Sequence, residues 1–203
     1  AMKISNAVFA GSSTVVSQKP EVRLPEFAFI GRSNVGKSSL INALTLTRLA
    51  KTASAPGKTR LVNHFLINNS WYLVDLPGYG YAKASDSERK AIEAVIRNYL
   101  NFSEELEMLF ILIDCRHNVG KADMDFIKEV AGSTLSFAFI YTKADKMGPV
   151  AVARQVEGMN AQILAAVPEL KELPPFFITS SESKKGREEV LDFIEKTLQN
   201  YAR

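Results

Sequence analysis

The sequence holds almost none of the residues with which small proteins are cross-linked. Among its 203 residues there are one cysteine, Cys115, and two histidines. A single cysteine excludes a disulfide within the chain, and there is no C-x-x-C motif or Cys/His cluster to indicate a zinc site. This shortage is typical of proteins from a reducing compartment, so we expect a cytoplasmic localisation.

Long hydrophobic runs are missing as well. The most apolar stretches, such as Met108 to Ile113, are only as long as a strand, whereas a membrane-spanning helix needs about 18 residues or more. The chain begins without the apolar segment of a signal peptide, so we expect no leader and no membrane partner. The 25 basic and 22 acidic side chains give a net charge of +3, which neither requires nor excludes nucleic acid as a partner.

From Glu26 onward the chain alternates between short apolar runs and longer segments of helical periodicity. This pattern predicts an α/β fold in which parallel strands are covered by helices on both faces. The expected strands are 27–30, 61–67, 71–76, 108–113, 135–141 and 176–178, and the expected helices are 37–45, 86–100, 121–131, 150–167 and 187–201. Only three residues separate 61–67 from 71–76, which favours a hairpin. We therefore predict a mostly parallel six-stranded sheet with one antiparallel strand.

A phosphate-binding loop follows the first of these strands. Residues 31–38 read GRSNVGKS and satisfy the pattern G-x-x-x-x-G-K-S/T between a strand and a helix. Its backbone N–H groups and the start of the helix would surround a polyphosphate. We expect Lys37 to reach the β- and γ-phosphates and the Ser38 hydroxyl to bind Mg²⁺. The alternative is a glycine-rich turn that binds nothing.

Two further segments have the residues needed to sense a γ-phosphate. Asp75-Leu76-Pro77-Gly78 ends a strand, and its glycine N–H can meet a phosphate while its carboxylate holds a Mg²⁺-bound water. Thr59 lies in a long connection without apolar periodicity, where it would join the Mg²⁺ shell only while a γ-phosphate is present. Taken alone, the first segment is a turn signal and the second an ordinary solvated loop.

The identity of the base is predicted from Thr142-Lys143-Ala144-Asp145, which follows another strand. The Asp145 carboxylate is an acceptor that matches the paired N–H donors of guanine, and adenine has no such pair. Lys143 can lay its aliphatic stem along the base. Thr179-Ser180-Ser181, after the last strand, offers backbone N–H groups for the guanine oxygen. GTP is therefore favoured over ATP.

The ordered set GRSNVGKSSLINAL, PGKTR, DLPGYGYAK, TKAD and TSS resembles the translation-factor-related GTPases and, among them, the EngB (YihA/YsxC) family of bacterial GTP-binding proteins. The resemblance covers about Leu24 to the C-terminus. It implies a three-layer P-loop NTPase fold of the small-GTPase type, with residues 1–22 as an N-terminal extension and 23–203 as the GTP-binding domain. It also implies a cytoplasmic GTPase that acts in late assembly of the large ribosomal subunit, with older links to cell division and septation.

Carried over residue by residue, the resemblance gives a full candidate site. Its catalytic residues would be Lys37, Thr59 and Gly78, and Ser38 and Thr59 would bind Mg²⁺. The nucleotide-binding residues would be Gly31, Arg32, Ser33, Asn34, Val35, Gly36, Lys37, Ser38, Gly57, Lys58, Thr59, Arg60, Leu61, Asp75, Leu76, Pro77, Gly78, Thr142, Lys143, Ala144, Asp145, Thr179, Ser180 and Ser181.

Turnover is expected to depend on a partner or on potassium. The residue after Asp-x-x-Gly is Tyr79, and a phenol cannot orient an attacking water as an amide does, so intrinsic hydrolysis should be slow. Asn34 occupies a position that resembles the one used by potassium-activated GTPases. A K⁺ ion there would supply positive charge beside the phosphates.

Two classes of function remain open at this stage. One is a GTP-hydrolysing assembly factor, expected to be a monomer, that binds rRNA and ribosomal protein of the large subunit in its GTP state. The other is a GTP-dependent interaction protein of cell division that touches no nucleic acid. Five basic residues lie in or near the two segments expected to sense the γ-phosphate, which we call the switch segments: Arg48, Lys51, Lys58, Arg60 and Lys83. They would suit RNA phosphate or be ordinary solvated side chains. A P-loop kinase is disfavoured because the sequence has no evident acceptor site.

Overall fold

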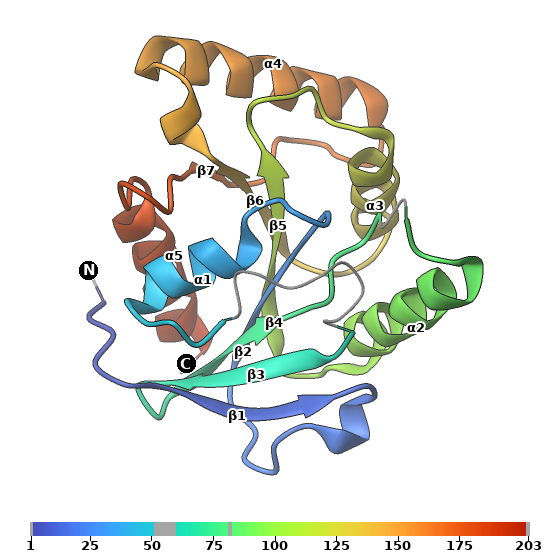
Figure 1. Ribbon diagram of the computed structural model, residues 1–203, viewed down its shortest axis with the longest axis vertical. Helices are drawn as coiled ribbons and strands as arrows, with labels where there is room; N and C mark the ends of the chain where they lie inside the picture. The colour runs from blue at the N-terminus through green and yellow to red at the C-terminus, as the bar shows by residue number, and fades with distance from the viewer. Residues whose placement is uncertain (1, 51–59, 81–82, 202–203) are drawn as a thin grey trace.

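The computed structural model describes residues 2–50, 60–80 and 83–201. Seven strands and five α-helices alternate along this part of the chain (Figure 1). The strands are β1 (Ala7–Ser13), β2 (Glu26–Gly31), β3 (Val62–Ile67), β4 (Trp71–Asp75), β5 (Leu106–Asp114), β6 (Phe137–Thr142) and β7 (Phe176–Ile178). The helices are α1 (Lys37–Thr45), α2 (Asp86–Phe102), α3 (Lys121–Ala131), α4 (Pro149–Ala166) and α5 (Arg187–Tyr201), with short 3-10 turns η1 (Val16–Gln18) and η2 (Ala144–Lys146).

All seven strands belong to one sheet in the order β1-β3-β4-β2-β5-β6-β7. β3 pairs antiparallel with both β1 and β4, and the other pairs are parallel. The expected α/β fold with one antiparallel strand is confirmed. The expected number of six strands is wrong, because residues 7–13 of the N-terminal segment pair with β3 and add a seventh strand at the edge.

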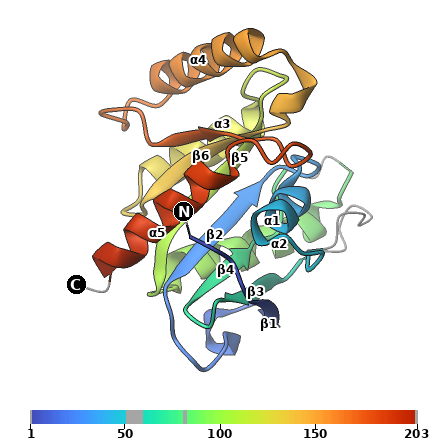
Figure 2. The same ribbon diagram turned by 90° about the vertical axis from the view of Figure 1, so that its left-hand side faces the viewer.

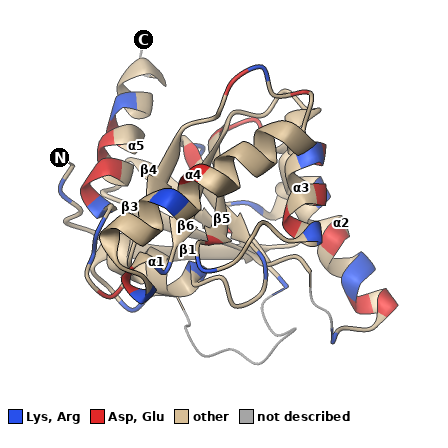
Figure 3. Ribbon diagram, turned by 90° about the horizontal axis from the view of Figure 1, so that it is seen from above, with Lys and Arg blue, Asp and Glu red and all other residues tan. Residues whose placement is uncertain are grey.

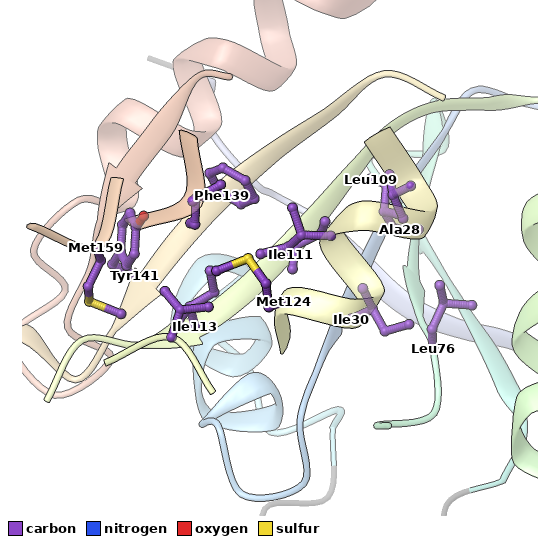
Figure 4. Close-up of a cluster of buried hydrophobic side chains, with 14 of the residues drawn as sticks. Ala28, Ile30, Leu76, Leu109, Ile111, Ile113, Met124, Phe139, Tyr141 and Met159 are labelled. Carbon is purple, nitrogen blue, oxygen red and sulfur yellow. The ribbon is translucent and has the colours of Figure 1, made fainter. Parts of the chain in front are cut away.

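The helices cover both faces of the sheet, as expected from the continuous apolar runs (Figure 2). Helices α2, α3 and α4 pack on one face, and α1 and α5 on the other. Successive residues of β5 point to opposite faces, so Leu109 and Ile111 join the first core while Phe110 joins the second. Figure 4 shows the first core, in which Ile111 and Phe139 of the sheet lie near Met124 of α3.

A buried cluster of charged and polar groups lies at the end of β2 opposite the phosphate loop. Glu26 is 1% exposed and accepts hydrogen bonds from Tyr99 and Ser103, and it also contacts Lys19 and His64. Burial raises the pKa of the Glu26 carboxyl, but its hydrogen bonds and charged neighbours outweigh burial and lower it to about 2. The cluster ties the N-terminal segment and α2 to the sheet.

Residues of both charges occur along α2, and most of them are exposed (Figure 3). The helix begins at an N-cap, Ser85, whose hydroxyl accepts a hydrogen bond from the Glu88 amide. Over the described ranges, the structure contains no helix of the length and apolarity that a bilayer crossing requires.

Candidate nucleotide-binding site

The loop between β2 and α1 has the backbone of a phosphate cradle. Asn34 and Gly36 have positive φ angles of 67° and 96°, and Gly36 directly precedes the first turn of α1. A side chain at Gly31 is excluded, because a Cβ there would lie 2.8 Å from Cγ1 of Val35 and 3.0 Å from the Leu112 carbonyl oxygen. The loop lies at the carboxyl ends of the parallel strands, where open α/β sheets bind their ligands.

Lys37 and Asp75, which belong to the two motifs expected to face the phosphates, meet at this loop. The Lys37 ammonium contacts Asp75 Oδ1, and both side chains are largely buried. The pair places a cation and an anion side by side, which matches the opposite charges of a phosphate and its Mg²⁺ ion. Ser38 follows in the first turn of α1, so its hydroxyl belongs to the same end of the helix.

The Asp-x-x-Gly turn is held against the phosphate loop by backbone hydrogen bonds. The Leu76 amide donates to the Phe29 carbonyl at 3.1 Å, and Pro77 and Gly78 are buried. The next residue, Tyr79, donates to Gly31 O at 3.1 Å and accepts from the Ser33 amide at 3.2 Å. Gly78 is therefore fixed at the mouth of the loop.

The two segments expected to read the base lie together. The Ala144 amide donates to the Thr179 carbonyl at 3.0 Å, and the Ser180 hydroxyl donates to Asp145 Oδ1 at 2.9 Å. Thr142 is buried and donates to the Val35 carbonyl at 2.7 Å. The base-reading segments are thus fixed relative to each other and to the phosphate loop.

Lys143 strengthens the connection to the phosphate loop. It takes a left-handed conformation, with φ of 65°, and its ammonium donates to the Asn34 carbonyl at 2.8 Å. Its Cε would lie 3.5 Å from a Cβ placed on Gly36. The aliphatic stem therefore runs alongside the loop, in the place expected for a lysine that packs on a base.

An open pocket of about 960 Å³ lies between α1 and the segments expected to read the base, whereas Lys37, Asp75 and Gly78 are not among its lining residues. It is of the size of a small-molecule site. Predicted residues Gly36, Thr142, Lys143, Asp145 and Ser181 line it, and the other side chains on its wall come from α1, the segment after α1, and the loops after β5, β6 and β7. Four of these further residues are basic: Arg48, Arg116, Lys146 and Lys184.

The pKa values of Asp145, on the pocket wall, and of the neighbouring Asp114 are both lowered. Burial raises the pKa of Asp145, but the hydrogen bond from Ser180 and the nearby Lys146 lower it overall. At Asp114, burial is likewise outweighed by hydrogen bonds from Arg116 and by the charge of Lys143, and the pKa falls to about 2. Asp145 is therefore an acceptor at neutral pH, as guanine recognition requires.

Of the predicted residues of the switch segment, 57–61, the structure describes Arg60 and Leu61. Gly57, Lys58 and Thr59 lie outside the described residues. Arg60 donates to Glu88 Oε2 of α2 at 3.0 Å, and Leu61 is 40% exposed. The proposed contact between Thr59 and Mg²⁺ stays a prediction, while Arg60 ties the end of this segment to α2.

Besides the further residues on the pocket wall, Asp114, Arg116 and Asp123 form ion pairs or hydrogen bonds around the site. Asp114 lies 3.4 Å from the Lys143 ammonium, and Arg116 donates to both oxygens of Asp114. Asp114 ends β5 and Arg116 follows it, at the carboxyl end of a parallel strand, and this position is the signal by which sequence could have found both residues. Asp123 of α3 accepts a hydrogen bond from the Tyr79 hydroxyl. No sequence pattern indicates a role for Asp123.

Comparison with known proteins agrees with this arrangement. A family model described as "50S ribosome-binding GTPase" matches residues 26–143. The chain is 48% identical over 202 residues to the probable GTP-binding protein EngB of Porphyromonas gingivalis, with 99% of each chain covered. It is 50% identical over 195 residues to the probable GTP-binding protein EngB of Bacteroides fragilis, with 96% of each chain covered.

Comparison with solved structures finds the same fold. The crystal structure of a probable GTP-binding protein engB superposes with a TM-score of 0.68 at 19% identity, covering 86% of this chain and 99% of the other. The family match spans the phosphate loop and reaches Lys143, and the full-length matches include the Thr179 segment as well. The chain belongs to the EngB family of GTP-binding proteins, within the 50S ribosome-binding GTPases.

Proposed function

We propose that this protein binds GTP and GDP with Mg²⁺, hydrolyses GTP slowly, and acts as a switch in late assembly of the large ribosomal subunit. The observation that carries the proposal is the convergence of four motifs, far apart in sequence, at one edge of the sheet. Phosphate loop, Asp-x-x-Gly turn and both base-reading segments are joined there by hydrogen bonds. The phosphate loop alone indicates a polyphosphate, and the four motifs together describe a guanine nucleotide.

Different residues at this edge are expected to bind the base, the phosphates and the metal ion of the nucleotide. Asp145 reads the guanine donors, and Lys143 covers the base. The N–H groups of the loop and the start of α1 bind the phosphates, with Lys37 supplying a counter-charge. Ser38 and Thr59 would hold Mg²⁺, whose chemistry is to neutralise charge that develops on the phosphates.

Slow turnover follows from the environment of Tyr79. Its hydroxyl donates to Asp123 on α3, and its ring stacks on Phe126. Because Tyr79 follows the Asp-x-x-Gly motif where an amide would orient the attacking water, we expect hydrolysis to need an activator. We propose that the activator is K⁺ beside Asn34 or the ribosomal partner.

The ribosome is proposed as partner because the family is described as binding the 50S subunit. The switch segment supplies a mechanism. Lys58 and Arg60 flank Thr59, so a γ-phosphate that orders Thr59 also fixes two cationic side chains. Arg60 is already paired with Glu88 of α2, and RNA phosphate would compete with that carboxylate. Ordering the segment in advance removes an entropic cost from RNA binding.

Cosedimentation in a sucrose gradient tests this proposal. We expect the protein to travel with the large subunit in the presence of a non-hydrolysable GTP analogue and to stay at the top of the gradient with GDP. Binding should weaken steeply with salt, because phosphate contacts release counterions. Equal bound fractions with the two nucleotides at matched salt would contradict the switch. Migration with division proteins instead would favour the second function class.

A matched pair of variants separates the switch cations from charge in general. Replacing Lys58 and Arg60 together by alanine should flatten the salt dependence by up to about two contacts. Replacing the exposed Lys171 and Lys196 removes the same charge elsewhere and should leave the slope unchanged. GTP affinity is measured in parallel, because Lys58 and Arg60 belong to the predicted nucleotide-binding set. Equal slopes for the two double variants would refute the role of the switch cations.

A further inference from the structure

Tyr79 connects the Asp-x-x-Gly turn to a helix that carries none of the nucleotide motifs. Its hydroxyl donates to Asp123 Oδ1 at 2.8 Å, and its ring stacks on Phe126 with centroids 4.7 Å apart and planes 20° from parallel. Asp123 is 6% exposed. Both partners belong to α3, so the side chain of Tyr79 is fixed on this helix by a charge-assisted hydrogen bond and an aromatic contact.

The backbone of the same residue is fixed on the phosphate loop. Tyr79 pairs with Arg32 as an isolated parallel bridge, with hydrogen bonds to Gly31 and from Ser33. Gly78 is the preceding residue, and one peptide unit spans about 3.8 Å between Cα atoms. The position of Gly78 at the mouth of the loop is therefore set by how firmly Tyr79 is held.

Arg32 reaches from the phosphate loop toward the same region. A Cβ at Gly80 would lie 3.6 Å from Arg32 Nε, and a Cβ at Gly120 would lie 3.2 Å from Arg32 Nη1. The two glycines therefore flank the guanidinium. Burial raises the pKa of Asp123 overall, although the hydrogen bond from Tyr79 and the positive charge of Arg32 act to lower it. The phosphate loop, the Asp-x-x-Gly turn and the start of α3 thus meet in one cluster.

We propose that Tyr79 is a positioning residue, anchored on Asp123 and Phe126, that holds the Gly78 amide where a γ-phosphate binds. This inference rests on the proposed binding of GTP. In this role the Tyr79 phenol contacts α3 and not the attacking water. The donor hydrogen of the hydroxyl is already used by Asp123, so it is not free to orient water.

The anchor predicts a difference between the two nucleotides. GDP has no γ-phosphate and does not use the Gly78 amide, whereas a GTP analogue does. Loosening Tyr79 adds disorder that only the triphosphate must remove on binding. A merely structural role of Tyr79 would change the affinity for both nucleotides alike or for neither.

The test is a titration of Tyr79→Phe and Asp123→Ala with GDP and with a non-hydrolysable GTP analogue, both with Mg²⁺. Tyr79→Phe keeps the ring on Phe126 and removes only the hydroxyl. We expect analogue affinity to fall by about fivefold or more, a typical allosteric coupling, and GDP affinity to change by less than about twofold. The double variant should be no weaker than either single one, because both changes remove the same bond.

Two further variants serve as controls. Asp123→Asn retains an acceptor for the Tyr79 hydroxyl and should recover most of the analogue affinity. Tyr99→Phe removes an equivalent bond, from a buried tyrosine to the Glu26 carboxylate at 2.6 Å, at the opposite end of β2. It should leave the ratio of the two affinities unchanged. Thermal melting of each variant shows whether it is folded.

An unchanged affinity ratio in Tyr79→Phe, with both nucleotides still bound, would overturn the inference. So would a loss of hydrolysis in Tyr79→Phe without any change in the ratio, because the phenol would then act on the reacting groups. A parent chain that bound neither nucleotide would refute the proposed function itself. These results are distinguishable, because the first two require a parent chain that binds nucleotide.

Discussion

At the scale of single residues, Lys37 and Asp75 show how the site balances charge. Their side chains are in contact and largely buried, so each supplies the counter-charge that the other needs. Removing one partner of a buried pair leaves the other uncompensated, which costs about 3–5 kcal/mol in measured cases. Substitutions here act on the protein as well as on the nucleotide, and binding experiments must separate the two effects.

Replacing Lys37 or Ser38 by alanine should weaken nucleotide binding in two different ways. Lys37→Ala removes positive charge from the phosphates and exposes them to Asp75, so binding falls with or without Mg²⁺. Ser38→Ala removes a metal ligand, so its effect should appear only when Mg²⁺ is present. Titrations with Mg²⁺ and with a chelator check this. An equal loss for Ser38→Ala under both conditions would exclude it as a magnesium ligand.

Asn34 leads to a prediction about monovalent ions. It takes a left-handed conformation beside the loop, with its carbonyl bound to the Lys143 ammonium. If its side chain helps to hold K⁺ beside the phosphates, GTP hydrolysis should be faster in potassium than in sodium at equal ionic strength. Asn34→Ala should remove the difference. Identical rates of the parent chain in the two salts would contradict the prediction.

The residues of the site differ in how far sequence could predict them. The phosphate loop and the Thr142–Asp145 segment carry spacings that chemistry demands, and the structure brings them together. Asp123 lies on a helix whose pattern reports only burial. Its partner Tyr79 is 44 positions away in the chain. Such a contact is created by tertiary packing, so no local sequence pattern predicts it.

At the scale of elements, the local sequence pattern predicts the helices better than it predicts the edge strand of the sheet. The bounds predicted for α1, α3 and α5 are confirmed, whereas α2 ends two residues later than predicted and α4 begins and ends one residue earlier. β1 was missed because only one of its residues is buried. An edge strand with a bulge between Phe9 and Gly11 lacks the continuous apolar run of a covered strand.

The segment before β3 is expected to respond only to GTP. Thr59→Ala should spare GDP binding and weaken binding of a non-hydrolysable GTP analogue, because Thr59 would join the Mg²⁺ shell only beside a γ-phosphate. Parallel titrations with both nucleotides measure this. A matched control is Thr14→Ala in the N-terminal segment, which bonds Gln18 far from the loop. Equal losses for GDP and the analogue would show that Thr59 has a different role.

At the scale of the whole molecule, Glu26 should contribute to the acid sensitivity of folding, beside the more exposed Asp114 and Asp145. The folded-state pKa of Glu26 is about 2, against 4.5 for the free side chain. The unfolded chain therefore binds more protons between these values. The contribution of Glu26 to stability, about 3 kcal/mol, is complete above about pH 5 and is lost as the pH falls toward 2. Burial opposes this shift, and the contacts with His64, Lys19 and Tyr99 cause it.

Denaturant unfolding of the parent chain and of Glu26→Gln across this range measures the effect. We expect the variant to be less stable at pH 7 and to lose less of its stability on acidification. Because the cluster and the phosphate loop lie at opposite ends of β2, Glu26→Gln should keep the nucleotide affinity of the parent at pH 7. Identical pH slopes for the two proteins would show that Glu26 does not control acid unfolding.

The central claim is that one edge of the sheet reads a guanine nucleotide through Asp145. The most direct test is a titration of the parent chain and of Asp145→Asn with GTP, ATP and xanthosine triphosphate, all with Mg²⁺. The parent should bind GTP and reject ATP. The variant should lose GTP and gain xanthosine triphosphate, because xanthine replaces the guanine amino donor with an acceptor that the new amide can satisfy. Equal affinity of the parent for GTP and ATP would contradict the account.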